Sequence, residues 1–510
     1  MTPPSHSSTV DDIVARSAAR HPDRPALHFQ DRSWTYRELD DAVSRAAAWL
    51  RDLGLSDGQR VATYGKNSDA YLLAYLACAR AGLVHVPINF ALTGEELRYL
   101  VEQSGAAAVL VDPAMRDTYD AAGLDVEIVR TLRDGPDSLL QAASEGGVPP
   151  LRDLRPAGGA DTDLVQLLYT SGTTSRPKGA MMTHRALVHE YVSCIHALEM
   201  RADERVLHPM PLYHSAQMHV FLLPYLAVGA ENWLLEVPDV PAVLRAVEEH
   251  AITALFLAPT VWVPLTNHDD FARRDLGSLR KAFYGASIMP GPVIERLVDA
   301  MPDVSVWNCF GQSEIGPLAT VLRPDERDAR PESCGRSVLF VELRVVDPES
   351  GEDVTAGGRG EVQYRSPQLC IGYWDKDEET EAAFVDGWFR SGDLVEIDAE
   401  GFITVVDRIK DVINTGGVLV ASREVEDALY THPAVAEVAV VGQPDDRWIE
   451  AVTAYVVLRP DADGAVDEET LIAHARSSLA GFKAPKAVHF VDALPRNQSG
   501  KLLKRELRRG

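Results

Sequence analysis

Hydrophobic residues recur along the first part of the chain with two alternating periods. Helical spacing of apolar residues covers three segments, Tyr36–Leu53, Ser68–Ala81 and Glu95–Gln103. Short apolar runs typical of buried strands lie between or after them, at Arg60–Tyr64, Leu83–Ile88, Ala106–Val111, Leu164–Tyr169, Ala230–Leu235 and Ala254–Leu257. Strands that alternate with helices predict crossover units, and therefore an α/β fold with layered, largely parallel sheets and flanking helices.

The pattern changes near residue 400. Short strands are predicted at Glu361–Tyr364, Leu394–Ile397 and Phe402–Val406, and a polar run follows at 407–411. The remaining stretch alternates helix (Ser422–Tyr430), strands (Val435–Val441 and Glu450–Leu458) and helix (Glu468–Leu479), which is enough for a small independent domain. We therefore predict a large domain of residues 1–407, a hinge at 408–411 and a small, mobile α+β domain of residues 412–510.

Composition and charge narrow the class of protein. Hydrophobic residues make up 46% and charged residues 25%, the balance of a soluble globular protein. A net charge of −26 predicts no nucleic-acid partner, because such a partner needs a basic surface. The five cysteines show no C-x-x-C spacing, so we expect a reducing, cytoplasmic location. No apolar run is long enough for a transmembrane segment, and the sequence leaves monomer and homodimer open.

The stretch Tyr169-Thr-Ser-Gly-Thr-Thr-Ser-Arg-Pro-Lys-Gly179 carries the strongest chemical signal. An apolar strand runs into a loop that is dense in hydroxyls and glycine and ends at Lys178. Such loops suit a triphosphate, since glycines let the backbone approach, hydroxyls and N–H groups donate, and lysine supplies positive charge. It is not a Walker loop, because Pro177 stands where that motif has glycine. The predicted phosphate contacts are Thr170, Ser171, Gly172, Thr173, Thr174 and Lys178.

This loop resembles the phosphate loop of the acyl-adenylate-forming superfamily, which includes acyl-CoA synthetases, nonribosomal peptide adenylation domains and luciferases. The resemblance covers nearly the whole chain because further motifs follow in order. They are a substrate-gating segment at 211–214 (Pro-Leu-Tyr-His), adenine and magnesium segments at 284–287 (Tyr-Gly-Ala-Ser) and 308–314 (Asn-Cys-Phe-Gly-Gln-Ser-Glu), a ribose-binding strand at 387–393, a hinge at 407–411 and a catalytic-lysine loop at 495–501.

The resemblance implies roles for these residues. Glu314 and Thr170 would bind Mg²⁺, a hard cation that prefers oxygen ligands. Asp393, supported by Arg408, would bind the ribose hydroxyls, and Lys501 would reach the α-phosphate as charge develops. Phe310 would stack on adenine, Asn308 would meet the adenine edge, and Ser313 would meet the α-phosphate. The remaining expected ATP contacts are Gly285, Ala286, Ser287, Cys309, Gly311 and Gln312, and His214 and Lys178 complete the catalytic set.

The acceptor of the activated group is implied to be coenzyme A. Amino-acid-activating relatives usually carry an aspartate near residues 213–215, and this chain has Tyr-His-Ser there. Gly416-Gly417 resembles the point where the family passes pantetheine close to the backbone, and Lys410 matches the family's hinge residue. No carrier domain follows, so a peptide-synthetase module is not expected, although a stand-alone loader remains open.

The expected acid is a medium- or long-chain fatty acid, followed by an aryl or arylacrylic acid. His214, Met218 and Gly285 are the candidates for its pocket. Three rival classes are an enzyme that passes its adenylate to an amine or activates an oxyanion such as nitrite without CoA, a serine hydrolase, and a silent nucleotide-binding module. The hydrolase lacks a G-x-S-x-G elbow. Two positions depart from the family pattern, since Ser175 and Ile449 stand where glycine is common.

Overall fold

The computed structural model of the protein describes residues 8–149, 154, 160–170, 176–287, 289, 291–415, 418–445, 447–459, 462, 466–496 and 502–508. The chain forms two compact units. The first comprises residues 1–170, 177–343 and 364–389, and the second comprises residues 171–176, 344–363 and 390–510. The second unit thus takes in more of the chain than residues 412–510, and a hinge at 408–411 stays a prediction.

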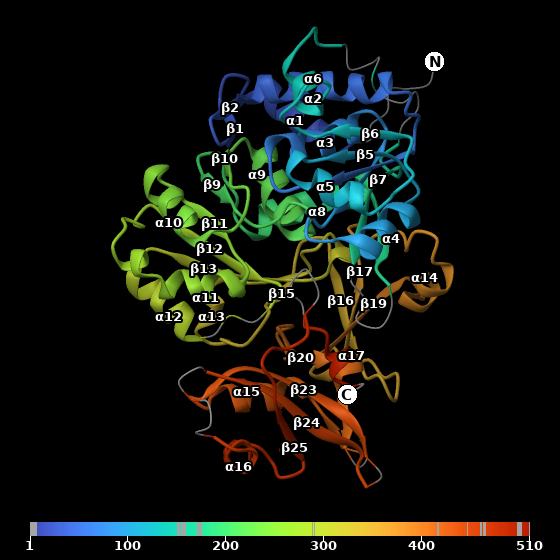
Figure 1. Ribbon diagram of the computed structural model, residues 1–510. Coiled ribbons are helices and arrows are strands. Elements are labelled where there is room, and N and C mark those ends of the chain that lie inside the picture. Colours follow the sequence, from blue (N-terminus) through green and yellow to red (C-terminus); the bar gives the residue numbers. More distant parts are fainter. Residues whose placement is uncertain are drawn as a thin grey trace. The chain divides into compact units, whose positions relative to one another are not determined.

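A nine-stranded sheet in the first unit has the order β15-β14-β13-β12-β11-β9-β10-β1-β2 (Figure 1). Strands β1 and β9 to β13 pair in parallel, whereas β2, β14 and β15 join antiparallel at the two edges. The strands are β1 (Pro25–Phe29), β2 (Arg32–Thr35), β9 (Arg205–His208), β10 (Glu231–Leu234), β11 (Ala254–Phe256), β12 (Lys281–Gly285), β13 (Ser305–Phe310), β14 (Thr320–Leu322) and β15 (Arg336–Ser337).

The second sheet of this unit has six strands in the order β6-β5-β3-β4-β7-β8. All neighbours are parallel except β8, which folds back on β7. The strands are β3 (Arg60–Tyr64), β4 (Val84–Ile88), β5 (Ala106–Val111), β6 (Ile128–Thr131), β7 (Leu164–Thr170) and β8 (Lys178–Thr183). The predicted α/β class with largely parallel sheets is confirmed.

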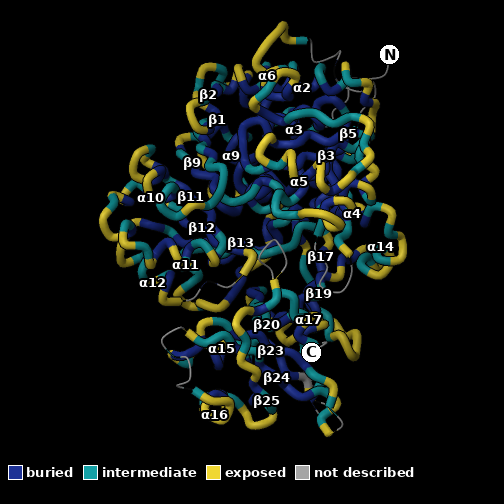
Figure 2. Tube along the Cα trace, in the orientation of Figure 1, coloured by how far each residue is buried: buried dark blue, intermediate teal, exposed yellow. Residues whose placement is uncertain are grey.

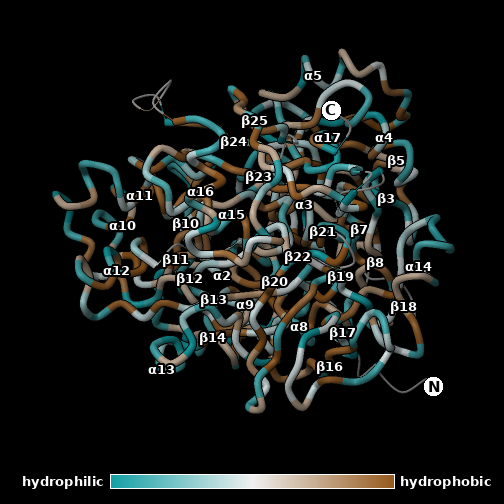
Figure 3. Tube along the Cα trace, turned by 90° about the horizontal axis from the view of Figure 1, so that it is seen from below, coloured by the Kyte–Doolittle hydropathy of each residue, from teal (hydrophilic) through white to brown (hydrophobic). Residues whose placement is uncertain are grey.

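Helices supply the crossovers that parallel strands require. Helix α3 (Asp69–Arg80) is buried along its whole length (Figure 2), and its terminal charges are paired, Asp69 with Arg32 at 2.7 Å and Arg80 with Asp11 at 3.2 Å. The other helices of this unit are α1 (Asp11–Arg20), α2 (Tyr36–Asp52), α4 (Gly94–Ser104), α5 (Arg116–Ala121), α6 (Leu139–Ser144), α8 (His184–Ala197), α9 (Leu223–Val228), α10 (Val240–Glu249), α11 (Pro259–Asn267), α12 (Gly291–Ala300), α13 (Pro324–Arg327) and α14 (Asp377–Ala383). Helix α14, which begins with three acidic residues, is hydrophilic along most of its length (Figure 3).

Two five-stranded sheets complete the fold. One has the order β16-β17-β19-β18 with β20 beside β19, and the other has the order β22-β21-β24-β23 with β25 beside β24. Their strands are β16 (Glu342–Val346), β17 (Gly358–Arg365), β18 (Phe384–Val385), β19 (Trp388–Ile397), β20 (Ile403–Arg408), β21 (Ile413–Thr415), β22 (Val418–Val420), β23 (Val435–Asp445), β24 (Ile449–Leu458) and β25 (Ala487–Phe490). The last sheet belongs to the second unit, with α15 (Ser422–Tyr430), α16 (Glu468–Ser478) and α17 (Lys504–Leu507).

Two further properties concern the cysteines and the length of the apolar helices. All five cysteines are buried. Within the residues that the structure describes, no helix is long and apolar enough to cross a membrane.

Candidate active site

The two ends of the phosphate loop are brought together by strand pairing. Strand β7 ends at Thr170 and β8 begins at Lys178, and the antiparallel register places these two residues opposite each other. The predicted hydroxyl ligand and the predicted lysine therefore lie side by side at the end of one hairpin. The intervening predicted contacts Ser171, Gly172, Thr173 and Thr174, and the unusual Ser175, lie outside the described residues.

The predicted magnesium ligands are in contact. Glu314 lies in a short 3₁₀ turn, Ser313–Ile315, that follows β13. Its Oε1 accepts a hydrogen bond from Thr170 Oγ1 at 3.1 Å and another from Tyr373 OH at 3.1 Å. A carboxylate beside a hydroxyl is a suitable donor set for Mg²⁺, which binds oxygen and keeps several of its waters. The described part of the chain holds no group of three or more His, Cys, Asp or Glu that could bind a metal ion.

The loop that follows Glu314 is held from behind by buried polar side chains. Glu190 on α8 accepts a hydrogen bond from Leu318 N at 2.9 Å, and Gln368 donates to Ile315 O at 3.3 Å, to Leu318 O at 3.2 Å and to Glu190. Glu190 is fully buried, and this burial raises its pKa to about 8. A network of satisfied buried polar groups fixes a loop more tightly than exposed contacts do.

The adenine segments lie at the carboxyl ends of two neighbouring parallel strands, β12 and β13, where ligands of open α/β sheets bind. Gly285 pairs in register with Cys309, and a Cβ at Gly285 would lie 2.3 Å from Cys309 O, so this close approach needs glycine. Ala286 follows with φ +66°, and Ser287 is exposed. The Asn308 amide donates to Ser333 O at 3.1 Å, so it braces a neighbouring segment.

The magnesium turn also touches the residue that follows the gating segment, because Ser313 Oγ lies 2.8 Å from Ser215 Oγ. The gating segment itself is fixed by Asn67, which accepts from Leu212 N at 2.7 Å and donates to Met210 O at 2.9 Å. A π-helix, Ala216–Leu222, follows directly, and such helices are rare and frequent at functional sites. Of the acid-pocket candidates, His214 is exposed, whereas Met218 is fully buried in the hydrophobic core.

The predicted ribose residues form an ion pair in the second unit. Asp393 on β19 and Arg408 at the end of β20 are register partners, and Arg408 Nε lies 2.7 Å from Asp393 Oδ1. Arg408 also donates to Ser391 O at 3.1 Å, and Asp393 N donates to Ser391 Oγ at 3.0 Å. A carboxylate accepts hydrogen bonds at both of its oxygens, so it is a suitable partner for the hydroxyls of a ribose.

The predicted hinge residue and the residues that flank Lys501 are also in the second unit. Lys410 lies in the short turn Ile409–Asp411, and its carbonyl accepts from Arg508 at 3.0 Å. Lys501 and the Gly416-Gly417 pair lie outside the described residues. On either side of Lys501, Arg496 pairs with Leu502, and Leu503 N donates to Pro495 O at 2.8 Å.

Three side chains at this site were not predicted from the sequence, namely Glu190, Gln368 and Tyr373. Glu190 had a detectable signal, because the apolar spacing of α8 puts it on the face that carries the buried Leu187 and Cys194. A carboxyl on a buried helix face needs partners and therefore marks a special position. Gln368 and Tyr373 offer no comparable signal, since their partners are far away in sequence.

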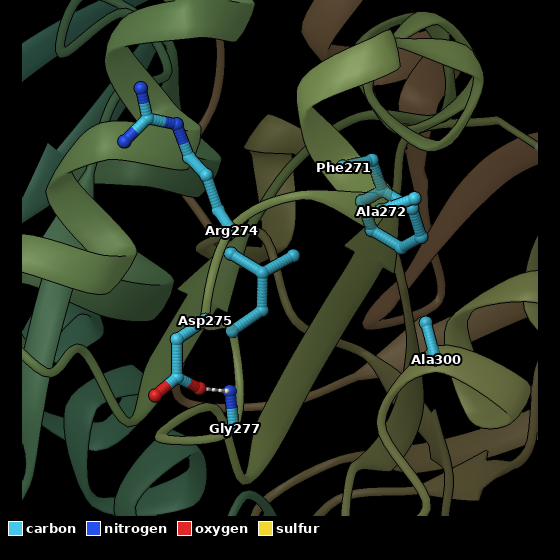
Figure 4. A pocket seen from close by; sticks show the side chains of 7 residues that line it. Phe271, Ala272, Arg274, Asp275, Gly277 and Ala300 are labelled. Atoms are coloured by element: carbon cyan, nitrogen blue, oxygen red, sulfur yellow. Dashed lines mark hydrogen bonds between the residues drawn. The ribbon is translucent and has the colours of Figure 1, made fainter.

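The cavity drawn in Figure 4 is separate from these residues. It has a volume of about 410 Å³ and is lined by Phe271, Ala272, Arg274, Asp275, Leu276, Gly277 and Ala300. Asp275 accepts a hydrogen bond from Gly277 N at 2.9 Å, which closes a local turn. None of the predicted site residues lines this cavity, and the Arg274 guanidinium in its lining is paired with Glu248 at 2.7 Å.

Comparison with known proteins identifies the family. The model of the AMP-binding enzyme family matches residues 14–374, and that of the AMP-binding enzyme C-terminal domain matches residues 424–501. A feruloyl-CoA synthase of Amycolatopsis sp is 39% identical over 495 residues, which cover 97% of this chain and 97% of the relative. A long-chain-fatty-acid–CoA ligase of Escherichia coli O157:H7 is 32% identical over 540 aligned positions, covering 99% and 95%. ATP-bound MatB from Rhodopseudomonas palustris has a TM-score of 0.88 at 31% identity, covering 98% and 99%.

The chain belongs to the AMP-binding enzyme family. Because its relatives are acyl-CoA synthetases, the protein is an AMP-forming acid–thiol ligase. It acts on a small-molecule carboxylic acid and uses ATP, Mg²⁺ and coenzyme A. The resemblance drawn from the motifs is thereby confirmed, and so is the predicted reaction class. The roles of individual residues stay predictions.

Proposed function

We propose that the acid is an aryl or arylacrylic acid. The observation that carries this proposal is the 39% identity to a feruloyl-CoA synthase over 97% of both chains, against 32% identity to a long-chain-fatty-acid ligase. The order expected from the sequence, with a fatty acid first, is therefore reversed. The gating segment supports the change, because Tyr213 packs edge-on against Phe90 with ring centroids 5.6 Å apart. Aromatic side chains in such a segment favour an aromatic ring by edge and stacking contacts.

In the adenylation step, a carboxylate oxygen of the acid would attack the α-phosphorus of ATP. A bond forms between that oxygen and the α-phosphorus, the bond from the α-phosphorus to the oxygen bridging the α- and β-phosphates breaks, and pyrophosphate leaves. Lys178 would neutralise the departing phosphates, and Thr170 and Glu314 would hold Mg²⁺, which neutralises charge on the phosphate oxygens. Asp393 with Arg408 would fix the ribose, so the nucleotide is oriented before charge develops.

In the second step, the thiol of coenzyme A would attack the acyl carbonyl and release AMP. We propose that its nucleotide end meets Trp448, whose ring lies 4.8 Å from Arg447 Cζ and 5.4 Å from Lys486 Nζ. An aromatic ring with two cations close to it suits an adenine base and its phosphates. The next residue, Ile449, has φ +67° and pairs with Thr415, which directly precedes the Gly416-Gly417 pair. Trp448→Ala should raise the KM for CoA by about tenfold, with Tyr430→Ala, another partly exposed aromatic residue of this unit, as the matched control.

The proposal is tested by pyrophosphate release with ferulate, cinnamate, benzoate, octanoate and palmitate, each with and without CoA. We expect kcat/KM to be highest for ferulate or cinnamate, with the thioester detected by mass spectrometry. A preference for palmitate would overturn the choice of acid. Formation of acyl-AMP that CoA does not consume would instead favour transfer to an amine or a carrier protein.

A further inference from the structure

Tyr373 lies between the two charged residues that are expected to handle the triphosphate. Its hydroxyl donates to Glu314 Oε1 at 3.1 Å, and its ring centroid lies 4.9 Å from Lys178 Nζ. The side chain is 6% exposed, so both contacts are shielded from solvent. A hydrogen bond to a charged group and a cation–π contact are both stronger when water is excluded.

The backbone of this segment is fixed against β8 and against the magnesium turn. Ile371 N donates to Met181 O at 3.0 Å, and Trp374 N donates to Gly179 O at 2.8 Å, so residues 371–374 extend the hairpin that carries Lys178. On the other side, Cys370 N donates to Glu314 O at 2.8 Å. The segment therefore joins the strand of Lys178 to the turn of Glu314, and Tyr373 projects from the point where they meet.

Lys178 and Glu314 carry opposite charges, yet within the described residues no ion pair of 4.0 Å or less joins them. An ion pair between them would neutralise both groups and would withdraw the lysine from the phosphates and the carboxylate from the cation. Tyr373 instead offers each group a separate partner, its π-face to the ammonium and its hydroxyl to the carboxylate.

We propose that Tyr373 is a positioning residue of the adenylation step. Its ring holds Lys178 and its hydroxyl orients Glu314, so the two charges stay apart and remain available to a magnesium-bound triphosphate. This inference rests on the proposed roles of Lys178 and Glu314. The hydroxyl contact of Tyr373 can be removed by itself, and both contacts can be removed together.

The test compares Tyr373→Phe with Tyr373→Leu. Phenylalanine keeps the ring and removes the hydroxyl, so the Mg²⁺ concentration for half-maximal ATP–pyrophosphate exchange should rise about tenfold, while the KM for ATP at saturating Mg²⁺ stays within about twofold. Leucine removes both contacts, so the KM for ATP should also rise, by about 3- to 30-fold. Tyr119→Phe is the matched control, because its ring lies 5.9 Å from Arg116 and its buried hydroxyl has no hydrogen-bond partner among the described residues.

Binding provides a readout that does not depend on turnover. Isothermal titration with α,β-methylene ATP, which cannot be adenylated, should show weaker binding to Tyr373→Phe in Mg²⁺ and unchanged binding in EDTA. Tyr373→Leu should bind more weakly in both. If both variants lose turnover equally while Mg²⁺ dependence and nucleotide affinity match the wild type, the role is structural and the proposal is wrong. A wild-type enzyme that binds the analogue but adenylates no tested acid would count against the proposed function alone.

Discussion

Two glutamates, one fully buried in the first unit and one mostly buried in the second, are held by partners of different charge. Glu190 is fully buried, and its described partners Leu318 N, Gln368 and Cys194 are all neutral. Burial raises its pKa to about 8. Glu426 in the second unit accepts from Val440 N at 2.7 Å, but it also faces Lys504 Nζ at 2.8 Å. Burial raises the pKa of Glu426 as well, although Lys504 opposes the rise.

The difference matters because Glu190 supports the segment of the predicted magnesium ligand, whereas Glu426 supports the segment of the predicted catalytic lysine. Glu190 stabilises the loop after Glu314 through hydrogen bonds to neutral partners, which salt screens little. Glu426, with Ser422, anchors Lys504, three residues after Lys501, through an ion pair and a 2.6 Å hydrogen bond. We infer that the magnesium side is a rigid part of the first unit, whereas the lysine side is held by charged pairs, of which Lys504–Glu426 is one and Arg508–Asp411 another.

The largest effect should come from the lysine itself. Lys501→Ala removes a charge that would stabilise the developing oxyanions, so adenylation should fall by about 10²–10³. Thioester formation from supplied acyl-AMP should stay nearly intact. Quench-flow measurements time the two steps separately.

Lys410→Pro should give the reverse result, because proline fixes φ and would hinder a rotation of the small domain about this residue. The variant should form acyl-AMP and transfer it slowly. Equal losses of adenylation and thioester formation in both variants would contradict the separate roles predicted for Lys501 and Lys410.

Removing the Lys504–Glu426 ion pair should have the next largest effect, and it should act on stability. Lys504→Met leaves the Glu426 carboxylate without its cation, which should cost about 3 kcal/mol of unfolding free energy. This is the low end for a buried pair, because the two side chains keep 14% and 15% exposure. Urea denaturation measures the loss, and Glu426→Gln/Lys504→Met should recover most of it. If the double variant is as unstable as the single one, the ion pair is not what anchors the tail.

The contribution of Glu190, the glutamate with neutral partners, is tested by measuring stability as a function of pH. Glu190 has a folded pKa of about 8, above its unfolded value, so its contribution is fully present below the unfolded pKa and is lost as pH rises through 8. Glu190→Gln lacks this titration. Any stability advantage of the wild type over this variant should therefore shrink between pH 5 and pH 8, by about 1.4 kcal/mol per unit at most. Parallel stability curves over this range would show that Glu190 is ionised throughout.

The smallest expected effect lies at Ile449. A β-branched residue at φ +67° is strained, so Ile449→Gly should stabilise the second unit by about 1 kcal/mol. Ile449→Ala removes the exposed side chain and keeps the strain, and it serves as the control. Thermal denaturation distinguishes the two, and equal shifts would show that exposure of the side chain matters more than the backbone.

Much of the fold could be predicted because local periodicity determined it. The predicted strands Arg60–Tyr64 and Ala106–Val111 and the predicted helix Ser422–Tyr430 match β3, β5 and α15 residue for residue. The structure also explains why glycine is common at position 449, since the backbone there is left-handed and glycine adopts that conformation without strain. The π-helix Ala216–Leu222 was not predicted, because its apolar residues fit an ordinary helix equally well.

The candidate site was predictable only where it lies in contiguous motifs. The resemblance predicted that Thr170 and Glu314 share one Mg²⁺, and the structure brings the two side chains into direct contact. Tyr373 and Gln368 could not be predicted, because their partners lie about 50 to 200 residues away and depend on how distant segments pack. Local patterns specify elements, whereas contacts between distant side chains follow from tertiary packing.

The burial of the cysteines has a practical consequence for following the reaction. Burial raises the pKa of the Cys78, Cys194, Cys309 and Cys370 thiols, and Cys334 is buried as well. A protonated, inaccessible thiol reacts slowly with disulfide reagents. A chromogenic disulfide added to the native enzyme should therefore titrate coenzyme A with little background from the protein, so consumption of the acceptor can be followed continuously by colour. Addition of denaturant at the end of the same assay should release the protein thiols and report the enzyme concentration.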